Sequence, residues 1–167
     1  MDIIRKRRAG PQRPELNAVM QQLVESLEAL EAQIARATRL LAAAAAADPV
    51  ATRLMSVPGV GPITALIFKS GIEAPARFAG GEDAGAFAGL GPSRSQCGMR
   101  DFKGRISKAG NLMLRHALYE AANSLLVRVK RSCALQTCGK RLAEIKGPKR
   151  ARVAPARKLA ILLFRLW

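Results

Sequence analysis

Histidine, cysteine and aromatic side chains are scarce in this sequence. His116 is the one histidine, the three cysteines form no Cys-x-x-Cys pair, and aromatic residues make up 4% of the chain. This composition excludes a His-rich metal site and a zinc finger, so we expect no metal site in the chain. The shortage of aromatic rings also argues against a sheet that stacks RNA bases.

Acidic residues and long apolar runs are scarce as well. The 167 residues include 12 Asp and Glu against 28 Lys and Arg, which gives a formal net charge of +16. The longest apolar runs, Leu40–Ala47 and Leu159–Phe164, fall short of the roughly 18 residues that span a bilayer, so we expect no membrane partner. An odd cysteine count without a secretory leader predicts a reducing compartment.

The positive charge is concentrated in the second half of the chain. Residues 93–167 carry 18 basic and three acidic groups, whereas residues 1–50 have a net charge of +1 and residues 51–92 of 0. Such an excess repels itself unless a polyanion neutralises it. We therefore expect this half to bind nucleic acid, and the alternative is a solvated basic face.

The pattern predicts an all-α fold in three parts. Residues 1–14 form a basic arm interrupted by Gly and Pro, which either contacts phosphates or is the scar of an upstream domain. Residues 15–48 form a coiled-coil helix that ends at Asp48-Pro49, and residues 49–167 form a compact helical domain.

The helix over residues 15–47 has a narrow apolar seam, with spacings of four and three residues that are typical of a coiled coil. The seam consists of Leu16, Met20, Leu23, Leu27, Leu30, Ile34, Ala37, Leu41 and Ala44. We expect a homodimer through residues 16–44, or pairing with another helix of the chain. The alternative is an amphipathic helix lying on its own domain.

Residues 52–72 predict two helices joined by a Pro58-Gly59-Val60-Gly61 turn, similar to a helix-hairpin-helix element. Gly59 and Gly61 allow a tight turn and leave N–H groups at the start of the second helix, where a helix terminus binds phosphate. We therefore interpret both glycines as DNA-binding. The alternative is a plain turn between two helices.

A cationic loop is predicted at residues 93–110, after a short helix that ends at Gly89. Its glycines, small side chains and five cations are typical of a functional loop. We assign DNA binding to these cations and to one residue of the helix that Asn111 caps. These residues are Arg94, Arg100, Lys103, Arg105, Lys108 and Arg115.

Two further helices are expected, over residues 135–145 and 154–167. The first stops at Gly147-Pro148, and the second has Pro155 in its first turn.

Three sequence blocks together resemble the C-terminal domain of the insertion-sequence one-ten family of transposases, over roughly residues 14–167. The blocks are Val57-Pro58-Gly59-Val60-Gly61-Pro62, Gly89-Leu90-Gly91-Pro92-Ser93-Arg94 continuing to Gly104–Asn111, and Val153-Ala154-Pro155-Ala156-Arg157-Lys158-Leu159-Ala160. The resemblance implies a guide-RNA-directed DNA recombinase of a bacterial cytoplasm and nucleoid. It also implies a RuvC-like domain with four acids for a divalent metal, a coiled-coil linker and a serine nucleophile.

The sequence departs from the family pattern in two ways. The RuvC-like domain is absent, so we expect no cofactor in this chain. The loop reads Gln96-Cys97-Gly98, so Cys97 occupies the nucleophile position. Cys97 is either a thiolate nucleophile activated by nearby cations or an inert loop thiol.

Two functional hypotheses follow. The first is the DNA-binding C-terminal domain of a transposase, an incomplete copy that is inactive by itself and acts in transposition of an insertion sequence. The second is a non-catalytic, dimerising nucleic-acid-binding protein derived from a transposase. DNA is the partner in both, and a structured guide RNA is a further partner in the first.

Overall fold

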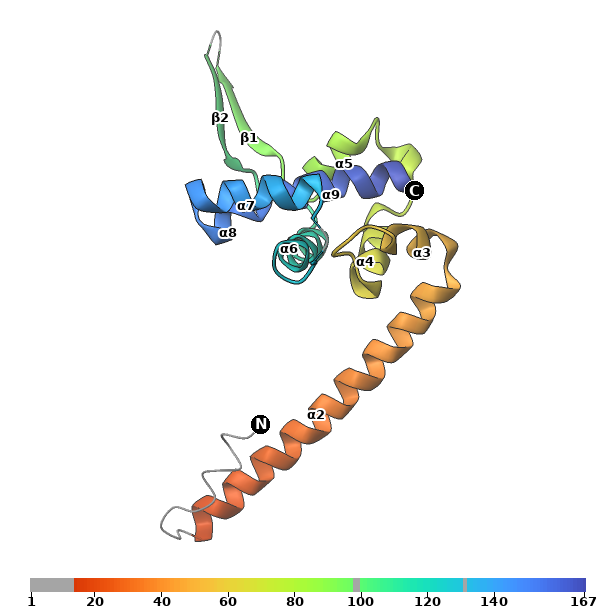
Figure 1. Ribbon diagram of the computed structural model, residues 1–167, viewed down its shortest axis with the longest axis vertical. Coiled ribbons are helices and arrows are strands. Elements are labelled where there is room, and N and C mark those ends of the chain that lie inside the picture. The colour runs from red at the N-terminus through yellow and green to blue at the C-terminus, as the bar shows by residue number, and fades with distance from the viewer. Residues whose placement is uncertain (1–13, 98–99, 131) are drawn as a thin grey trace. The chain divides into compact units, whose positions relative to one another are not determined.

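The computed structural model describes residues 14–97, 100–130 and 132–167 (Figure 1). At residues 14, 15, 94–97, 100–103 and 105 it describes the backbone alone. The chain divides into two units, Met1–Leu40 and Leu41–Trp167. The predicted boundaries at residues 14 and 48 stay predictions, and most of the predicted basic arm lies outside the described residues.

The first unit is formed by one long helix, α2, which spans Pro14–Ala47 and continues into the second unit. The helix was predicted within one residue at each end. The large apolar side chains of its seam are exposed: Leu23 has 60% of its surface accessible, Leu30 55% and Ile34 65%. The homodimer, pairing with another helix of the chain, and the alternative of a helix lying on its own domain all stay predictions.

The second unit begins with two short helices, α3 (Pro49–Met55) and α4 (Pro62–Ile72). Asp48 starts α3 because its Oδ1 accepts hydrogen bonds from the backbone N of Val50 at 2.9 Å and of Ala51 at 3.3 Å. Its other carboxylate oxygen accepts a hydrogen bond from Lys69 Nζ of α4. Asp48 therefore fixes the α3 start and joins α3 to α4.

The hydrophobic core lies where α4, α5 (Gly81–Phe87), α6 (Leu112–Val127) and α9 (Val153–Leu166) pack. Phe68 of α4, Leu118 of α6 and Leu163 of α9 are fully buried in it. Burial of each such side chain stabilises the fold by about 1.5–3 kcal/mol. A short 3-10 helix, η2 (Pro75–Arg77), leads from α4 towards α5.

Helix α6 is capped at both ends by hydrogen bonds with amide side chains. At its start, Asn111 Oδ1 accepts a hydrogen bond from Leu114 N at 3.0 Å, as predicted for the cap. At its end, the buried Gln136 donates from Nε2 to the carbonyls of Leu125 at 3.0 Å and Val129 at 2.7 Å. Gln136 belongs to α7 (Ala134–Lys146), so these bonds also attach α7 to α6.

The last two helices are α8 (Pro148–Ala151) and α9, which follow Gly147 at a φ of 79°. The C-terminal end of α9 packs back into the core, where Trp167 lies with its ring centroid 6.3 Å from that of Phe68. Phe78 lies between Phe87 and Phe164, at 5.4 Å and 6.0 Å. These ring contacts attach α9 to α4 and to the segment around α5.

The prediction of an all-α fold is confirmed, but the prediction of a loop over residues 93–110 was wrong for most of its length. Residues Pro92–Cys97 (β1) and Arg100–Ile106 (β2) pair as antiparallel strands, which project from the helices in Figure 1. The segment has few β-branched residues, so its sequence gave little indication of strands. Backbone hydrogen bonds at the base of the strand pair, such as that from Ser107 N to the Gly91 carbonyl, hold the two strands together.

Candidate nucleic-acid interface

The turn between α3 and α4 places two glycines in different environments. Gly59 has a φ of +89°, and a Cβ there would lie 2.8 Å from the carbonyl oxygen of Ala121 and 2.9 Å from Leu125 Cβ. Gly61 is the N-cap of α4, has a φ of −100°, and faces open space. Gly59 therefore allows close packing on α6, whereas Gly61 leaves room for a ligand.

The N-terminus of α4 has unpaired backbone donors. Its first helical hydrogen bond runs from Ala65 N to the Gly61 carbonyl at 3.0 Å. The N–H groups of Ile63 and Thr64 therefore have no partner within the helix, and Pro62 has no N–H. An α-helix N-terminus with free N–H groups favours an anion such as phosphate.

A cleft of about 210 Å³ lies beside this turn, between α4 and α6. Its lining combines Gly59 and Thr64 with three polar residues of α6 and with the residue that caps its C-terminus, namely Glu120, Asn123, Ser124 and Arg128. The Oδ1 atom of Asn123 is buried without a hydrogen-bond partner. These polar residues carry no distinctive signal in the sequence, because their spacing of three to four residues is also that of an ordinary solvated helix face.

Most of the predicted DNA-binding cations belong to residues of the two paired strands. Arg94 lies opposite Lys103, and Cys97 lies opposite Arg100, beside the tip. Arg105 lies on β2 near the base. The side chains of these five residues lie outside the described part of the structure, so their assigned roles stay predictions.

The base of the strand pair is attached to the helices by backbone hydrogen bonds. Ser107 N donates to the Gly91 carbonyl at 2.8 Å, Lys108 N to Gly89 at 3.1 Å, and Asn111 N to Phe87 at 2.9 Å. Lys108 has a φ of 56°, and its side chain is exposed. These bonds fix where the cationic strands leave the domain.

Arg115 reinforces this base from α6. Its Nη1 donates hydrogen bonds to the carbonyl of Lys108 at 2.8 Å and to that of Ala88 at 3.3 Å. This geometry gives Arg115 a positioning role, which the sequence alone does not indicate. Its predicted contact with DNA stays a prediction.

The predicted residues form two groups along α6. Gly59 packs against residues 121–125, whereas Arg115 lies about 12 Å away along the helix axis at 1.5 Å per residue. The turn of α3 and α4 thus lies towards one end of α6, and the strand pair towards the other. A ligand that contacts both groups must be elongated.

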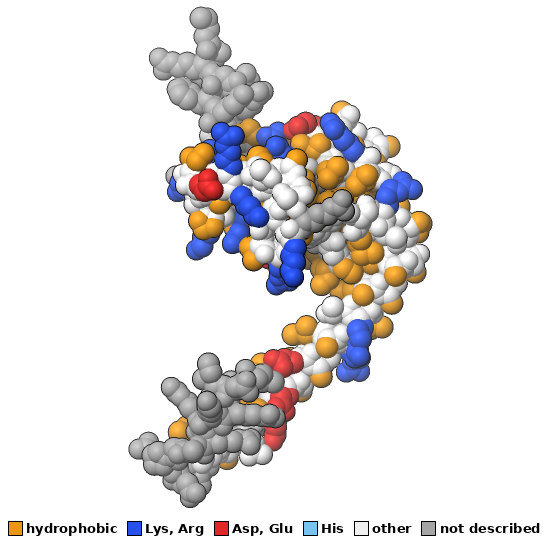
Figure 2. Space-filling model, in the orientation of Figure 1, with side chains coloured by type: hydrophobic (Ala, Val, Ile, Leu, Met, Phe, Trp, Pro, Cys, Tyr) orange, Lys and Arg blue, Asp and Glu red, His pale blue; other side chains and the backbone are white. Residues whose placement is uncertain are grey.

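Few of the cations are neutralised within the described residues. The described ion pairs are Lys69–Asp48, Arg77–Glu73 at 2.8 Å and Arg157–Glu82 at 2.6 Å. Arg157 is the one member of the basic half among them. Figure 2 shows Lys and Arg side chains spread over one face of the second unit with little acidic surface between them.

The described residues form neither a metal site nor a membrane-spanning helix. No group of three or more His, Cys, Asp or Glu side chains could hold a metal ion there. The part of the chain that the structure describes therefore offers no fit for the divalent metal that the resemblance implies. In the same residues, no helix is both long and apolar enough to cross a bilayer.

The fold and the site define a basic helical domain with a protruding pair of strands. The family model of the transposase IS116/IS110/IS902 family matches residues 51–138, which include the α3–α4 turn and the strand pair. The chain belongs to this family of transposases, and the predicted resemblance is confirmed.

Curated relatives from three bacteria align with about three quarters of the chain. A putative transposase y4pF/y4sB of Sinorhizobium fredii is 38% identical over 122 residues, which cover 72% of this chain and 32% of the relative. The transposase for insertion sequence element IS1111A of Coxiella burnetii is 36% identical over 127 residues, covering 75% and 35%. A probable family 20 transposase of Pseudomonas aeruginosa is 32% identical over 122 residues, covering 73% and 35%. The chain thus spans about a third of the length of these relatives.

Proposed function

We propose that this chain is a DNA-binding domain that acts in transposition of an insertion sequence. The α3–α4 turn and the paired strands form its DNA-binding surface. The observation that carries the proposal is the concentration of 18 basic against three acidic groups in residues 93–167, within a transposase family. Binding of this kind would place the chain on the bacterial nucleoid.

The α4 terminus supports contact with the phosphate backbone. Gly61 faces open space, two N–H groups of the first turn are free within the helix, and Arg128 lies beside the same cleft. Contacts of this kind position a duplex without reading its sequence. We therefore expect similar affinity for unrelated DNA sequences.

Salt-dependent binding tests the proposal. The full chain is titrated into labelled duplex and branched DNA, and fluorescence anisotropy is followed between 50 and 200 mM salt. Neutralisation of six phosphates gives a slope of log K against log salt of about −5. Failure of the folded chain to bind either DNA at 50 mM salt would refute the proposal.

Matched variants locate the surface. Arg128→Gln and Lys108→Gln should each reduce the steepness of the slope on duplex DNA by about 0.9, because each removes one phosphate contact. Arg77→Gln removes the same charge from η2, outside the proposed surface, where Arg77 pairs with Glu73. An equal reduction of the salt slope in all three variants would show that net charge, rather than this surface, governs binding.

We also propose that residues 16–44 form a homodimer. The exposed seam of α2 supports this, because apolar side chains at heptad spacing gain stability by packing on a second helix. Leu30→Lys should yield a monomer in sedimentation experiments at micromolar concentration. Ala29→Lys, which lies off the seam, should leave the dimer intact, and a monomeric wild-type chain would refute the pairing.

Strand transfer through Cys97 is a second candidate function. The resemblance places Cys97 at the nucleophile position, and the backbone register pairs it with Arg100, a residue of the cationic strand pair. This activity requires the metal-binding RuvC-like half and a guide RNA, both of which the resemblance implies. It predicts a covalent adduct with a suicide DNA substrate that Cys97→Ala abolishes. Salt-sensitive binding without an adduct supports the non-catalytic, dimerising alternative.

A further inference from the structure

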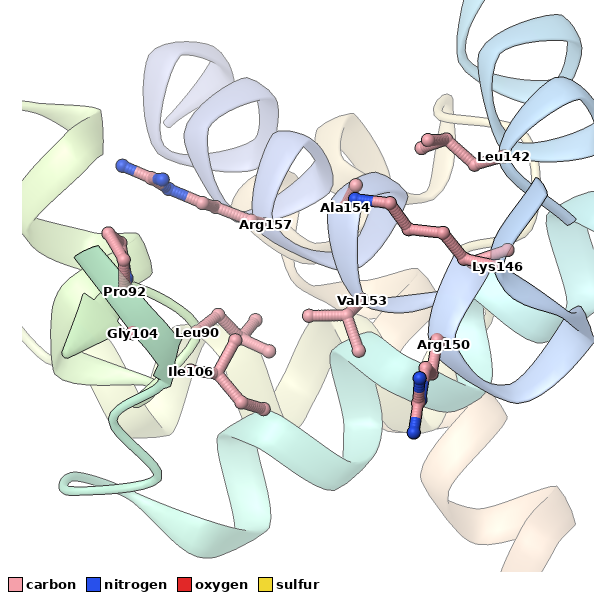
Figure 3. A pocket seen from close by; sticks show the side chains of 11 residues that line it. Leu90, Pro92, Gly104, Ile106, Leu142, Lys146, Arg150, Val153, Ala154 and Arg157 are labelled. Atoms are coloured by element: carbon pink, nitrogen blue, oxygen red, sulfur yellow. The ribbon is translucent and has the colours of Figure 1, made fainter. Parts of the chain in front are cut away.

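A second cleft, of about 290 Å³, opens where the paired strands meet the helices (Figure 3). We call it the basal cleft, and its lining comes from the strand base and from α7, α8 and α9. Leu90, Ile106 and Val153 converge at its centre in Figure 3. The volume is at the lower end of the range for ligand sites, so it suits one small group and not a duplex.

Three cations border the basal cleft, and no acidic residue is part of its lining. Arg157 is paired with Glu82 at 2.6 Å. Lys146 and Arg150 form no ion pair with a carboxylate of the described residues, and both are exposed. Two uncompensated cations above an apolar floor match a ligand that joins a phosphate to an apolar body.

A nucleotide has this combination of groups. Apart from the three cations, the lining side chains are aliphatic, so none of them accepts a hydrogen bond from a 2′-hydroxyl. The lining therefore has no side chain that selects RNA over DNA. Apart from the cations, it also has no hydrogen-bonding side chains that could distinguish one base from another.

We propose that the basal cleft takes one unpaired nucleotide of a DNA strand, with Lys146 and Arg150 on its phosphate and the aliphatic floor against its sugar and base. This inference rests on the proposed DNA binding and adds a preference for unpaired strands. The cleft lies at the strand base, so a nucleotide held there would continue along the cationic strands.

The test compares two DNA substrates that differ by one feature. One is a fully paired duplex, and the other is the same duplex with a short unpaired flap. The wild-type chain should bind the flapped DNA more tightly. The double variant Lys146→Gln, Arg150→Gln should lose this preference, and its salt slope on the flap should become shallower by about 1.4.

A matched control is available on α7, the helix that carries Lys146. Lys140→Gln, Arg141→Gln removes two exposed charges of α7 that lie outside the cleft lining. This control should keep the preference for the flapped DNA. All four substituted residues are exposed, so neither double variant threatens the core.

Several results would overturn the inference. Equal weakening by both double variants would show a general charge effect. Tighter binding of an RNA flap than of the DNA flap would show an RNA site. Normal duplex binding without a flap preference refutes this inference alone, whereas no DNA binding refutes the proposed function.

Discussion

At the scale of single residues, the two glycines of the α3–α4 turn have separate roles. Gly59 adopts a left-handed conformation in close contact with the α6 backbone, whereas Gly61 is in extended backbone and faces open space. In the Pro-Gly-x-Gly turn, the first glycine therefore allows close packing on α6, and the second leaves room for a ligand. Alanine substitution at each glycine distinguishes the two roles.

Gly59→Ala should destabilise the chain by about 2 kcal/mol or more. Alanine is disfavoured at a φ of +89°, and its Cβ would overlap Ala121 and Leu125. Gly61→Ala should cost less, about 0.5–1 kcal/mol for alanine at a helix N-cap, because the added Cβ faces open space. Urea denaturation, monitored by circular dichroism, measures the free energy of unfolding of both variants. Equal losses of stability would contradict the separate roles of the two glycines.

Asp48 should make stability depend on pH in the acid range. The hydrogen bond from Lys69 holds the pKa of the Asp48 carboxyl below its usual value. Its stabilising effect is therefore fully present above the unfolded-state pKa of about 3.9 and is lost as the pH falls through the lower folded-state pKa.

Asp48→Asn should thus lower the urea midpoint at pH 6, and its difference from wild type should shrink towards pH 2. Glu28→Gln, on the exposed surface of α2, serves as the control and should show no such convergence. A difference that stays constant with pH would exclude a role for the Asp48 charge.

At the scale of elements, the attachment of the strand pair depends on Arg115. Arg115→Gln should speed hydrogen exchange of the amides in β1 and β2, because the carbonyls of Ala88 and Lys108 lose a charged donor. The expected cost in stability is about 1–3 kcal/mol. Arg128→Gln, at the C-cap of α6, should leave exchange in the strands unchanged. Unaltered exchange in Arg115→Gln would show that the backbone bonds are sufficient.

The helices could be predicted from sequence because local signals mark them. Asn111 and the Gly147-Pro148 pair mark the predicted helix ends, and the spacing of Leu114, Leu118 and Leu125 marks a buried face. The strands could not be predicted, because their pairing depends on contacts such as Ser107 N to the Gly91 carbonyl, which join segments 16 residues apart in sequence. Such contacts leave no periodic pattern.

The candidate site was predictable only in part for a similar reason. Gly59 and Gly61 stand in one short motif, so their position at a helix start could be read directly. Lys146 and Arg150 border the basal cleft only because α7 and α8 fold against the strand base. Before folding, they are two cations among 18 in the basic half.

At the scale of the whole molecule, the two units should be separable. The fragment Leu41–Trp167 contains the complete described core, so it should fold cooperatively and melt at a midpoint that does not depend on its concentration. The full chain should melt at a midpoint that rises with concentration if α2 pairs with a second copy. Scanning calorimetry over a hundredfold concentration range measures both. A fragment without a cooperative transition would show that α2 is needed for folding.

The contact between Trp167 and Phe68 has a practical consequence for these experiments. Trp167 is the one indole in the sequence, and it lies against a fully buried ring of α4. Its emission should shift to the red when α9 leaves the body of the domain, because water then reaches the indole. The intrinsic fluorescence of Trp167 therefore reports unfolding of the domain, and no dye has to be attached near the cations.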